Sequence, residues 1–66
     1  MNMDLLETKI EESGYSKEFI SKQLGISRHG LYDKLKNPDR WKVTEMTVLV
    51  RLLSLNRSDS KQIFED

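Results

Sequence analysis

The 66-residue sequence predicts an all-α fold of five short helices, forming a single domain over residues 1–66. Apolar residues recur at the three- and four-residue spacing of amphipathic helices along most of the chain. Serine and glycine residues stand where such helices would begin and end. One segment contains a β-branched run, but neither a partner strand nor a hairpin turn accompanies it, so no β-sheet is expected.

The first helix is expected from about Met3 to Ser13. Asp4 and Glu7 lie near its N-terminus, where the positive end of the helix dipole favours carboxylates. Gly14 would end this helix, because glycine adopts left-handed backbone angles at little cost. The apolar side of the helix would consist of Leu5, Leu6 and Ile10.

Residues 16–36 contain two amphipathic patterns that meet at one glycine, and this arrangement predicts a helix-turn-helix. Ser16 would cap the first of these helices by accepting from a backbone N–H, and Tyr15 would pack against Ile20. Gly25 would end the helix in a left-handed conformation. The side chains expected to face inward are Phe19, Ile20 and Leu24.

Ser27 would cap the second helix of this motif, which is expected from Arg28 to about Lys36. Leu31 and Leu35 would face the core, because residues four apart share one side of a helix. The remaining side chains would form an outward face that can contact DNA bases, and they are Arg28, His29, Tyr32, Asp33 and Lys36.

The segment from Asn37 to Arg40 is expected to be a loop, because Pro38 cannot continue a helix. Trp41 follows. We expect it to anchor the loop on the core while its indole N–H stays near the surface. The alternative is that Trp41 stacks on DNA.

The segment from Val43 to Leu55 carries apolar side chains around most of a helix circumference, which predicts a central helix that the others surround. The β-branched residues Thr47 and Val48 would also suit a strand, but a helix is preferred because no partner strand is evident. Asn56 would end this helix, and Ser58 would cap a fifth one. The residues of the fifth helix expected to return to the core are Ile63 and Phe64.

The composition excludes several classes of function. The chain has no cysteine and one histidine, so neither a disulfide nor a metal centre is expected, and no motif calls for a cofactor. The longest apolar-rich run, Met46 to Leu53, is interrupted by polar residues and is too short to span a membrane. A catalytic set of Ser27, His29 and Asp33 would lie on an exposed helix face without a pocket, so the protein is not expected to be an enzyme.

The formal net charge is zero, but the charges are unevenly distributed. Residues 1–15 carry −3, residues 16–42 carry +4, and residues 43–66 carry −1. Positive charge therefore coincides with the helix-turn-helix pattern, as expected for a side of a protein that faces DNA. Chance clustering is the alternative, because the charges are few.

The spacing of small and aliphatic residues in the motif is more specific than its composition. Ser21 is followed four residues later by Gly25, then by Ile26 and Ser27, and Leu31 lies five residues beyond Ile26. In this pattern the sequence resembles the lambda-repressor-like helix-turn-helix family of XRE or Cro type, especially small phage transcriptional regulators. The resemblance covers nearly the whole chain and continues through Trp41, Glu45, Met46, Ile63 and Phe64.

Two positions depart from the pattern of this family. Gly30 lies inside the second motif helix, where glycine costs about 1 kcal/mol relative to alanine. Lys42 occupies the expected N-cap of the fourth helix, where the family usually has serine or threonine.

The resemblance implies a sequence-specific regulator of transcription whose recognition helix, residues 28–36, enters the major groove of double-stranded DNA. Arg28, His29 and Asp33 would contact base edges, and Tyr32 and Lys36 lie beside them. The residues expected to contact DNA phosphates are Ser16, Lys17, Ser27, Asn37, Arg40 and Lys42.

Two of these assignments have alternatives, and two further lysines have no assigned role. Asp33 could instead form an ion pair with Lys34 or Lys36. For Tyr32, packing against the loop that holds Trp41 is preferred to a contact with DNA. Lys22 and Lys34 could equally be solvated surface residues.

The resemblance also implies a repressor-like protein in the cytoplasm of a bacterial host, associated with the nucleoid. One small domain covers few base pairs, so a homodimer on a palindromic operator is expected. It would be weak or DNA-assisted, because the chain has no dedicated dimerisation domain. The alternative is an antirepressor-type module that acts on a partner regulator protein without binding DNA, and the near-neutral charge suits it. A fragment of a larger regulator is a further alternative, although a methionine start and an end after the fifth helix favour a complete Cro-sized protein.

Overall fold

The computed structural model describes residues 1–65, which form helices joined by short loops. In chain order the elements are α1 (Met3–Ser13), α2 (Lys17–Leu24), α3 (Arg28–Lys36), the 3-10 helix η1 (Pro38–Arg40), α4 (Val43–Leu52) and α5 (Arg57–Phe64). No strand occurs within residues 1–65, so the expectation of an all-α fold is confirmed. No helix in this range combines the length and the apolar character needed to cross a membrane.

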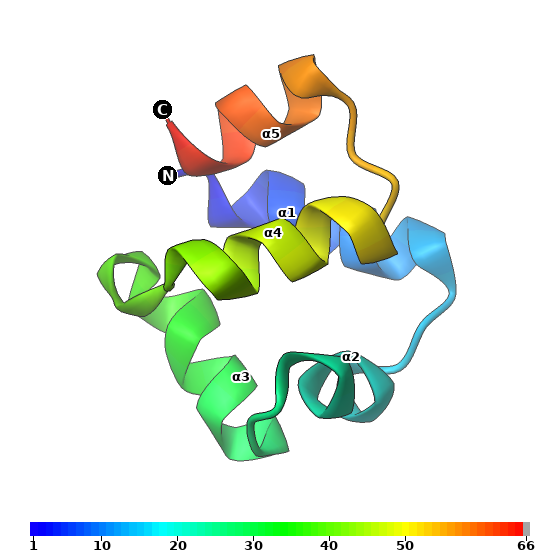
Figure 1. Ribbon diagram of the computed structural model, residues 1–66, viewed down its shortest axis with the longest axis vertical. Coiled ribbons are helices and arrows are strands. Elements are labelled where there is room, and N and C mark those ends of the chain that lie inside the picture. The colour runs from blue at the N-terminus through cyan, green and yellow to red at the C-terminus, as the bar shows by residue number, and fades with distance from the viewer. Residues whose placement is uncertain (66) are drawn as a thin grey trace.

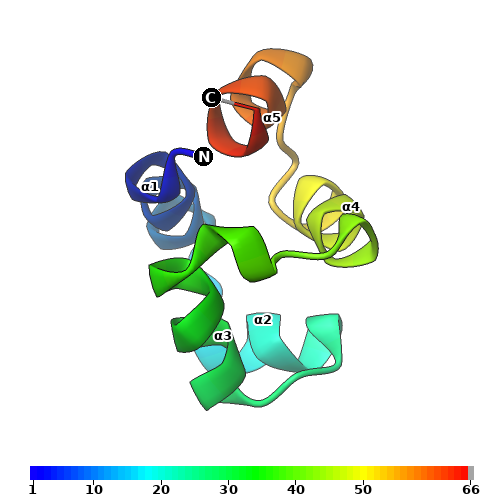
Figure 2. The same ribbon diagram turned by 90° about the vertical axis from the view of Figure 1, so that its left-hand side faces the viewer.

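Figures 1 and 2 show α5 at one end of the molecule and α2 and α3 at the other, with α1 and α4 on opposite sides between them. Figure 1 shows α1 and α5 beside the two chain ends, and α2 and α3 at the opposite end of the molecule. The backbone N–H of Asn2 donates to the carbonyl of Ile63 at 2.8 Å, and Lys9 pairs with Asp59 at 3.5 Å, which joins α1 to α5. In Figure 2, η1 bridges from the end of α3 to the start of α4. The helix-turn-helix pair therefore projects away from both termini.

One hydrophobic core receives side chains from all five α-helices of residues 1–65. Its buried members are Leu6, Ile10, Ile20, Leu31, Trp41, Leu49, Leu55 and Ile63. Because each helix contributes only one or two fully buried side chains, no pair of helices has a core of its own. The helices therefore depend on one another for stability, as expected in so short a chain.

The expected ends of the two motif helices are confirmed. The hydroxyl of Ser16 accepts from the N–H of Phe19 at 3.0 Å, and the hydroxyl of Ser27 accepts from the N–H of Gly30 at 2.9 Å. Gly14 and Gly25 adopt left-handed backbone angles, with φ of 79° and 73°. These local signals fix where α1 and α2 end and where α2 and α3 begin.

The expected boundaries around the last turn of α4 are wrong. The helix ends at Leu52 rather than Leu55, because the N–H of Leu55 bonds to the carbonyl of Val50 at 3.0 Å and turns the chain. Asn56, not Ser58, caps α5, since its side chain accepts from the N–H of Asp59 at 2.7 Å. Residues 38–40, expected as a loop, form the short helix η1, with Pro38 at its first position.

Several apolar side chains expected to be buried lie at the surface. Val43 is 75% exposed at the start of α4, so this helix has one solvated face and is not surrounded by the others. Phe19 is 40% exposed, and its ring pairs with that of Tyr15 at a centroid distance of 5.0 Å. Tyr15 therefore packs on Phe19, while the expected contact of Tyr15 with Ile20 stays a prediction.

Trp41 belongs to the core, as expected, with 6% of its surface exposed. The position of its indole N–H differs from the expectation. Nε1 is buried and has no hydrogen-bond partner among the described residues, so it does not reach the surface. The ammonium of Lys34 lies 5.8 Å from the centre of the ring, so a cation covers one aromatic face.

Trp41→Ala should destabilise the domain by about 3–5 kcal/mol, because it removes a large buried side chain and leaves a cavity. That loss approaches the total stability of a domain of this size. Urea unfolding followed by helical circular dichroism measures it. Trp41→Phe is the matched control and should cost much less, since it keeps a ring and removes the unpaired N–H. A small effect of alanine would contradict the burial of Trp41.

Ser54→Gly should stabilise the protein by about 0.5–1 kcal/mol. Among the non-glycine residues described, Ser54 alone has a positive φ, 53°, where a side chain is strained. The same unfolding measurement checks this, with Ser60→Gly inside α5 as the control. That control should lose about 0.5 kcal/mol, because glycine is a poor helix former. If both variants lost stability, Ser54 would not be strained.

Candidate nucleic-acid interface

The helices α2 and α3 are held close together by small residues. Ser21 is almost completely buried where the helices meet, and its hydroxyl donates to the carbonyl of Glu18 at 2.7 Å. Gly30, the unusual glycine of α3, lies against the N-cap: a Cβ added there would be 3.2 Å from Oγ of Ser27. A larger residue would therefore lie in tight contact with the capping hydroxyl.

One side of α3 carries the side chains expected to contact bases. Arg28, His29, Tyr32 and Lys36 are exposed, and Asp33 is half-buried. These five residues follow helical spacing, while Leu31 on the other side is completely buried. The expected division of α3 into an inward and an outward face is therefore confirmed.

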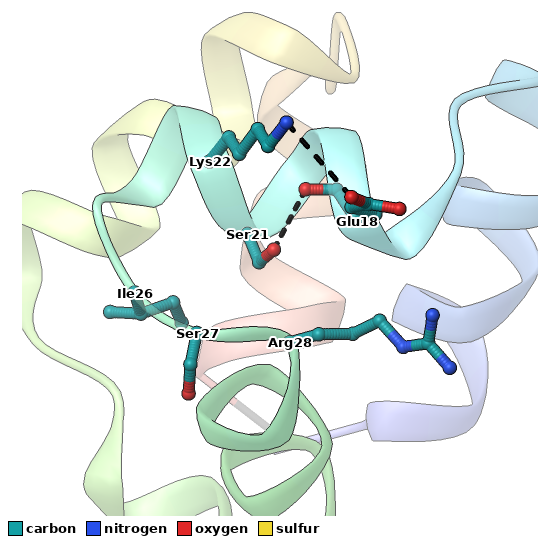
Figure 3. Close-up of a pocket in the computed structure, with 6 residues that line it drawn as sticks. All are labelled: Glu18, Ser21, Lys22, Ile26, Ser27 and Arg28. Carbon is teal, nitrogen blue, oxygen red and sulfur yellow. Dashed lines mark hydrogen bonds and ion pairs between the residues drawn. The ribbon is translucent and has the colours of Figure 1, made fainter.

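Figure 3 shows the groove between α2 and the start of α3, with Arg28 extending along it towards the beginning of α2. The groove has a volume of about 420 Å³ and is lined by Glu18, Ser21, Lys22, Ile26, Ser27 and Arg28. Lys22 is exposed and lies 3.9 Å from Glu18. Sequence reasoning gave Glu18 no role, although its place one helical turn before Lys22 predicts the pair.

Tyr32 lies beside two cations. The ammonium of Lys17 is 5.0 Å from the ring centre, and the guanidinium carbon of Arg28 is 6.0 Å from it. These residues share a second hollow, of about 340 Å³, with Ser16 and Glu18. Tyr32 is thus directed towards the start of α2, and packing against the loop that holds Trp41 stays a prediction.

Lys17 also connects the motif to α1. Its ammonium pairs with Oε2 of Glu7 at 3.2 Å. Glu7 was expected only to favour the start of α1, so this pairing was missed, and no sequence signal identifies it because the residues lie ten positions apart. The ion pair with Glu7 therefore holds the Lys17 ammonium beside Tyr32, in the hollow that both residues line.

The carboxylate of Asp33 is occupied by residues that follow α3. Its Oδ2 accepts from Nη1 of Arg40 at 2.8 Å, and its Oδ1 accepts from Nδ2 of Asn37 at 3.1 Å. The same Asn37 nitrogen donates to the carbonyl of Asp33 at 3.0 Å. Asp33 thus forms an ion pair, as the alternative expectation has it, but its partner is Arg40 and not Lys34 or Lys36.

Lys34 is not a solvated residue, because only 13% of its side chain is exposed. Its ammonium pairs with Oε1 of Glu45 at 3.0 Å and donates to the carbonyl of Arg40 at 2.9 Å. We call these contacts the Lys34 clasp. The clasp joins α3, η1 and α4, and its members were not recognised as a unit from the sequence.

Glu45 completes the start of α4. Its Oε1 also accepts from the backbone N–H of Lys42 at 2.9 Å, so Lys42 is the N-cap residue as expected, although its own side chain supplies no acceptor. Burial by itself raises the pKa of Glu45, but the hydrogen bonds from Lys42 and Lys34 and the charges of both residues outweigh it. The pKa of Glu45 is therefore lowered, and the carboxylate is ionised at neutral pH.

No protein-family model matches this chain, and no curated protein or solved structure is significantly similar to it. Across residues 1–65, no cluster of three His, Cys, Asp or Glu side chains is arranged to hold a metal ion. Geometry and charge around α2 and α3 therefore carry the functional inference.

Glu45→Gln should remove a part of the stability that depends on pH. Since the folded-state pKa of Glu45 lies below its ordinary value of 4.5, the ionised group stabilises the fold above about pH 4.5. That contribution is lost as the pH falls through the lower, folded-state pKa. Unfolding free energies measured at about pH 7 and about pH 3 should show a wild-type advantage that shrinks at the lower pH.

The control for this measurement is Glu11→Gln, at an exposed position of α1. It should change stability much less than Glu45→Gln at neutral pH. An advantage of the wild type over Glu45→Gln that stayed constant across the pH range would contradict the lowered pKa.

Proposed function

We propose that this protein is a sequence-specific, double-stranded DNA-binding regulator of transcription with a lambda-repressor-like helix-turn-helix fold. The observation that carries the proposal is the exposed face of α3, where Arg28, His29, Tyr32 and Lys36 lie on one side of a projecting helix. A helix of this width fits the major groove, where base pairs present distinct patterns of donors and acceptors. The net positive charge of residues 16–42, the segment that contains α3, also supports binding of DNA at this face.

The side chains of α3 differ in what they offer a base. Arg28 can donate two hydrogen bonds to guanine O6 and N7, and His29 can donate or accept one. Both stand in the first turn of α3, the part that enters the groove first in this motif. Tyr32 and Lys36 follow at successive turns and can reach the neighbouring base pairs or their phosphates.

Residues at the edges of α3 would hold the DNA backbone. Ser16 and Ser27 use their oxygens as helix caps and keep a hydroxyl hydrogen to donate to phosphate. Lys17, at the first position of α2, adds a charge to the free N–H groups of that helix. The following segment would contribute the exposed cations Arg40 and Lys42. Asn37 could contact a phosphate only by giving up a hydrogen bond to Asp33, because both hydrogens of its side-chain amide are used there.

The size of the domain favours binding as two copies. Its longest dimension is 27 Å, whereas successive half-sites on one side of B-DNA lie roughly 34 Å apart. A symmetric pair would occupy both half-sites of a palindromic operator, with the association assisted by DNA. This proposal places the protein on the chromosome of a bacterial host, in the cytoplasm.

A second candidate function is a protein-interaction module of antirepressor type. The observation that favours it is the exposed aromatic pair of Tyr15 and Phe19. Tyr15 borders a hollow of about 460 Å³ with Val48 and Leu52 of α4. Salt-dependent binding of the wild type to random duplex separates the two functions, because a module that acts only on protein would show none.

The DNA-binding proposal predicts that Arg28→Ala and Arg40→Ala have different effects. If Arg28 donates to a guanine edge, its removal should cost about 1–3 kcal/mol on the preferred site and relax selectivity at one base pair per half-site. If Arg40 holds a phosphate, its removal should weaken preferred and random duplexes alike. The magnitude of the salt slope of the affinity should then fall by about one for each phosphate that is no longer bound.

The measurement is fluorescence anisotropy on two labelled duplexes at several salt concentrations. The preferred duplex comes from selection of bound sites from a random pool. Arg57→Ala, at the exposed start of α5, is the control. It should change neither the base selectivity nor the salt slope of the affinity appreciably. If Arg28→Ala weakened all sequences equally and kept the wild-type base preference, α3 would not be the recognition helix.

A further inference from the structure

Asp33 lies on the exposed side of α3, among side chains that can contact bases, yet its contacts point elsewhere. One carboxylate oxygen is bound by Arg40 at 2.8 Å and the other by Asn37 at 3.1 Å. A carboxylate contacts DNA bases by accepting from cytosine N4. Each carboxylate oxygen has about two acceptor sites, so the existing donors do not block a base contact but fix the carboxylate towards the segment after α3. Both oxygens of Asp33 already have charged or polar donors from the segment after α3.

Arg40 is held at two points by consecutive residues of α3. Its guanidinium is bound by Asp33, and its backbone carbonyl accepts from the ammonium of Lys34 at 2.9 Å. Lys34 is in turn fixed by Glu45 at 3.0 Å, so the clasp ties the Arg40 backbone to α4. The Arg40 side chain is nonetheless 63% exposed, and only Nη1 is used by Asp33.

We propose that Asp33 is a positioning residue: it does not contact a base, but holds the Arg40 guanidinium in place for a DNA phosphate. The inference rests on the proposed DNA-binding function. An arginine side chain loses considerable rotamer freedom when it binds, and a side chain ordered beforehand loses less. No hydrogen bond among residues 1–65 uses the remaining guanidinium N–H groups, so they can donate to a phosphate beside the C-terminal end of α3.

This assignment divides the exposed side of α3 by function. Base selectivity belongs to Arg28 and His29 in the first turn, together with Tyr32. Asp33 contributes uniform affinity through Arg40. The two roles give opposite results when Asp33 is changed, because phosphates carry no sequence information and base edges do.

The test is a double-mutant cycle of Asp33→Asn and Arg40→Ala, measured by anisotropy on the selected duplex and on random duplex. Asp33→Asn should weaken binding to both by a similar factor, about three- to tenfold, and leave base preference unchanged. In the Arg40→Ala background the same change should have no weakening effect, since Asp33 acts through Arg40.

Asp39→Asn is the matched control, because Asp39 is an exposed carboxylate of η1, adjacent to Arg40 in the chain, and no ion pair involves it within residues 1–65. It removes the same charge near the DNA and should leave binding unchanged or slightly tighter. A thermal melt of each variant, expected to stay within a few degrees of the wild type, verifies that the domain is folded.

Two results would overturn the assignment while the proposed function stood. Relaxed selectivity of Asp33→Asn at one base pair would show that Asp33 contacts a base. Tighter binding, equal to that of Asp39→Asn and the same in both Arg40 backgrounds, would show that the pair does not prepare Arg40. If the wild type bound neither duplex, the DNA-binding function itself would be wrong, and the role of Asp33 in it would fall as well.

Discussion

The Lys34 clasp is the constraint on which the arrangement of α3, η1 and the start of α4 depends. The ammonium of Lys34 lies 3.0 Å from the Glu45 carboxylate and donates to the carbonyl of Arg40 at 2.9 Å. It also lies over one face of the Trp41 ring. Each of these groups belongs to a different part of the chain after α3. Because both charged side chains are nearly buried, removing either would leave an unpaired charge in a poorly solvated site. The clasp therefore fixes the orientations of α3 and α4 relative to η1.

The same cluster explains how the domain manages with an imperfect N-cap. Lysine cannot accept a hydrogen bond, so Lys42 leaves the first N–H groups of α4 without a side-chain acceptor. Glu45 reaches back to the N–H of Lys42 at 2.9 Å and receives Lys34 on the same oxygen. One carboxylate thus serves a helix start and a tertiary contact together.

The ion pairs of this protein differ in what they contribute. Nζ of Lys22 lies 3.9 Å from Oε1 of Glu18, and both side chains are largely exposed. Such pairs contribute little to stability. Asp33 and Arg40 are partly exposed, so their close contact lies outside the core, and we propose that it orders the Arg40 side chain. Among the ion pairs of residues 1–65, only that of Lys34 and Glu45 has both side chains shielded from water. Two neighbouring residues of α3, Asp33 and Lys34, therefore form ion pairs of very different burial.

The sequence by itself determined the helices, the ends of α1 and α2, and the inward and outward faces of α3. These features depend on hydrogen bonds within one or two turns, such as those of Ser16, Ser27 and Gly25, and on the spacing of a few apolar residues. Only the tertiary structure decided the partners of Lys17, Asp33 and Lys34, which lie on other segments and compete with several similar charges nearby. It also decided that Phe19 is exposed and that the Trp41 N–H is buried. Helical spacing gives the direction of a side chain, but the neighbouring helices determine whether anything covers it.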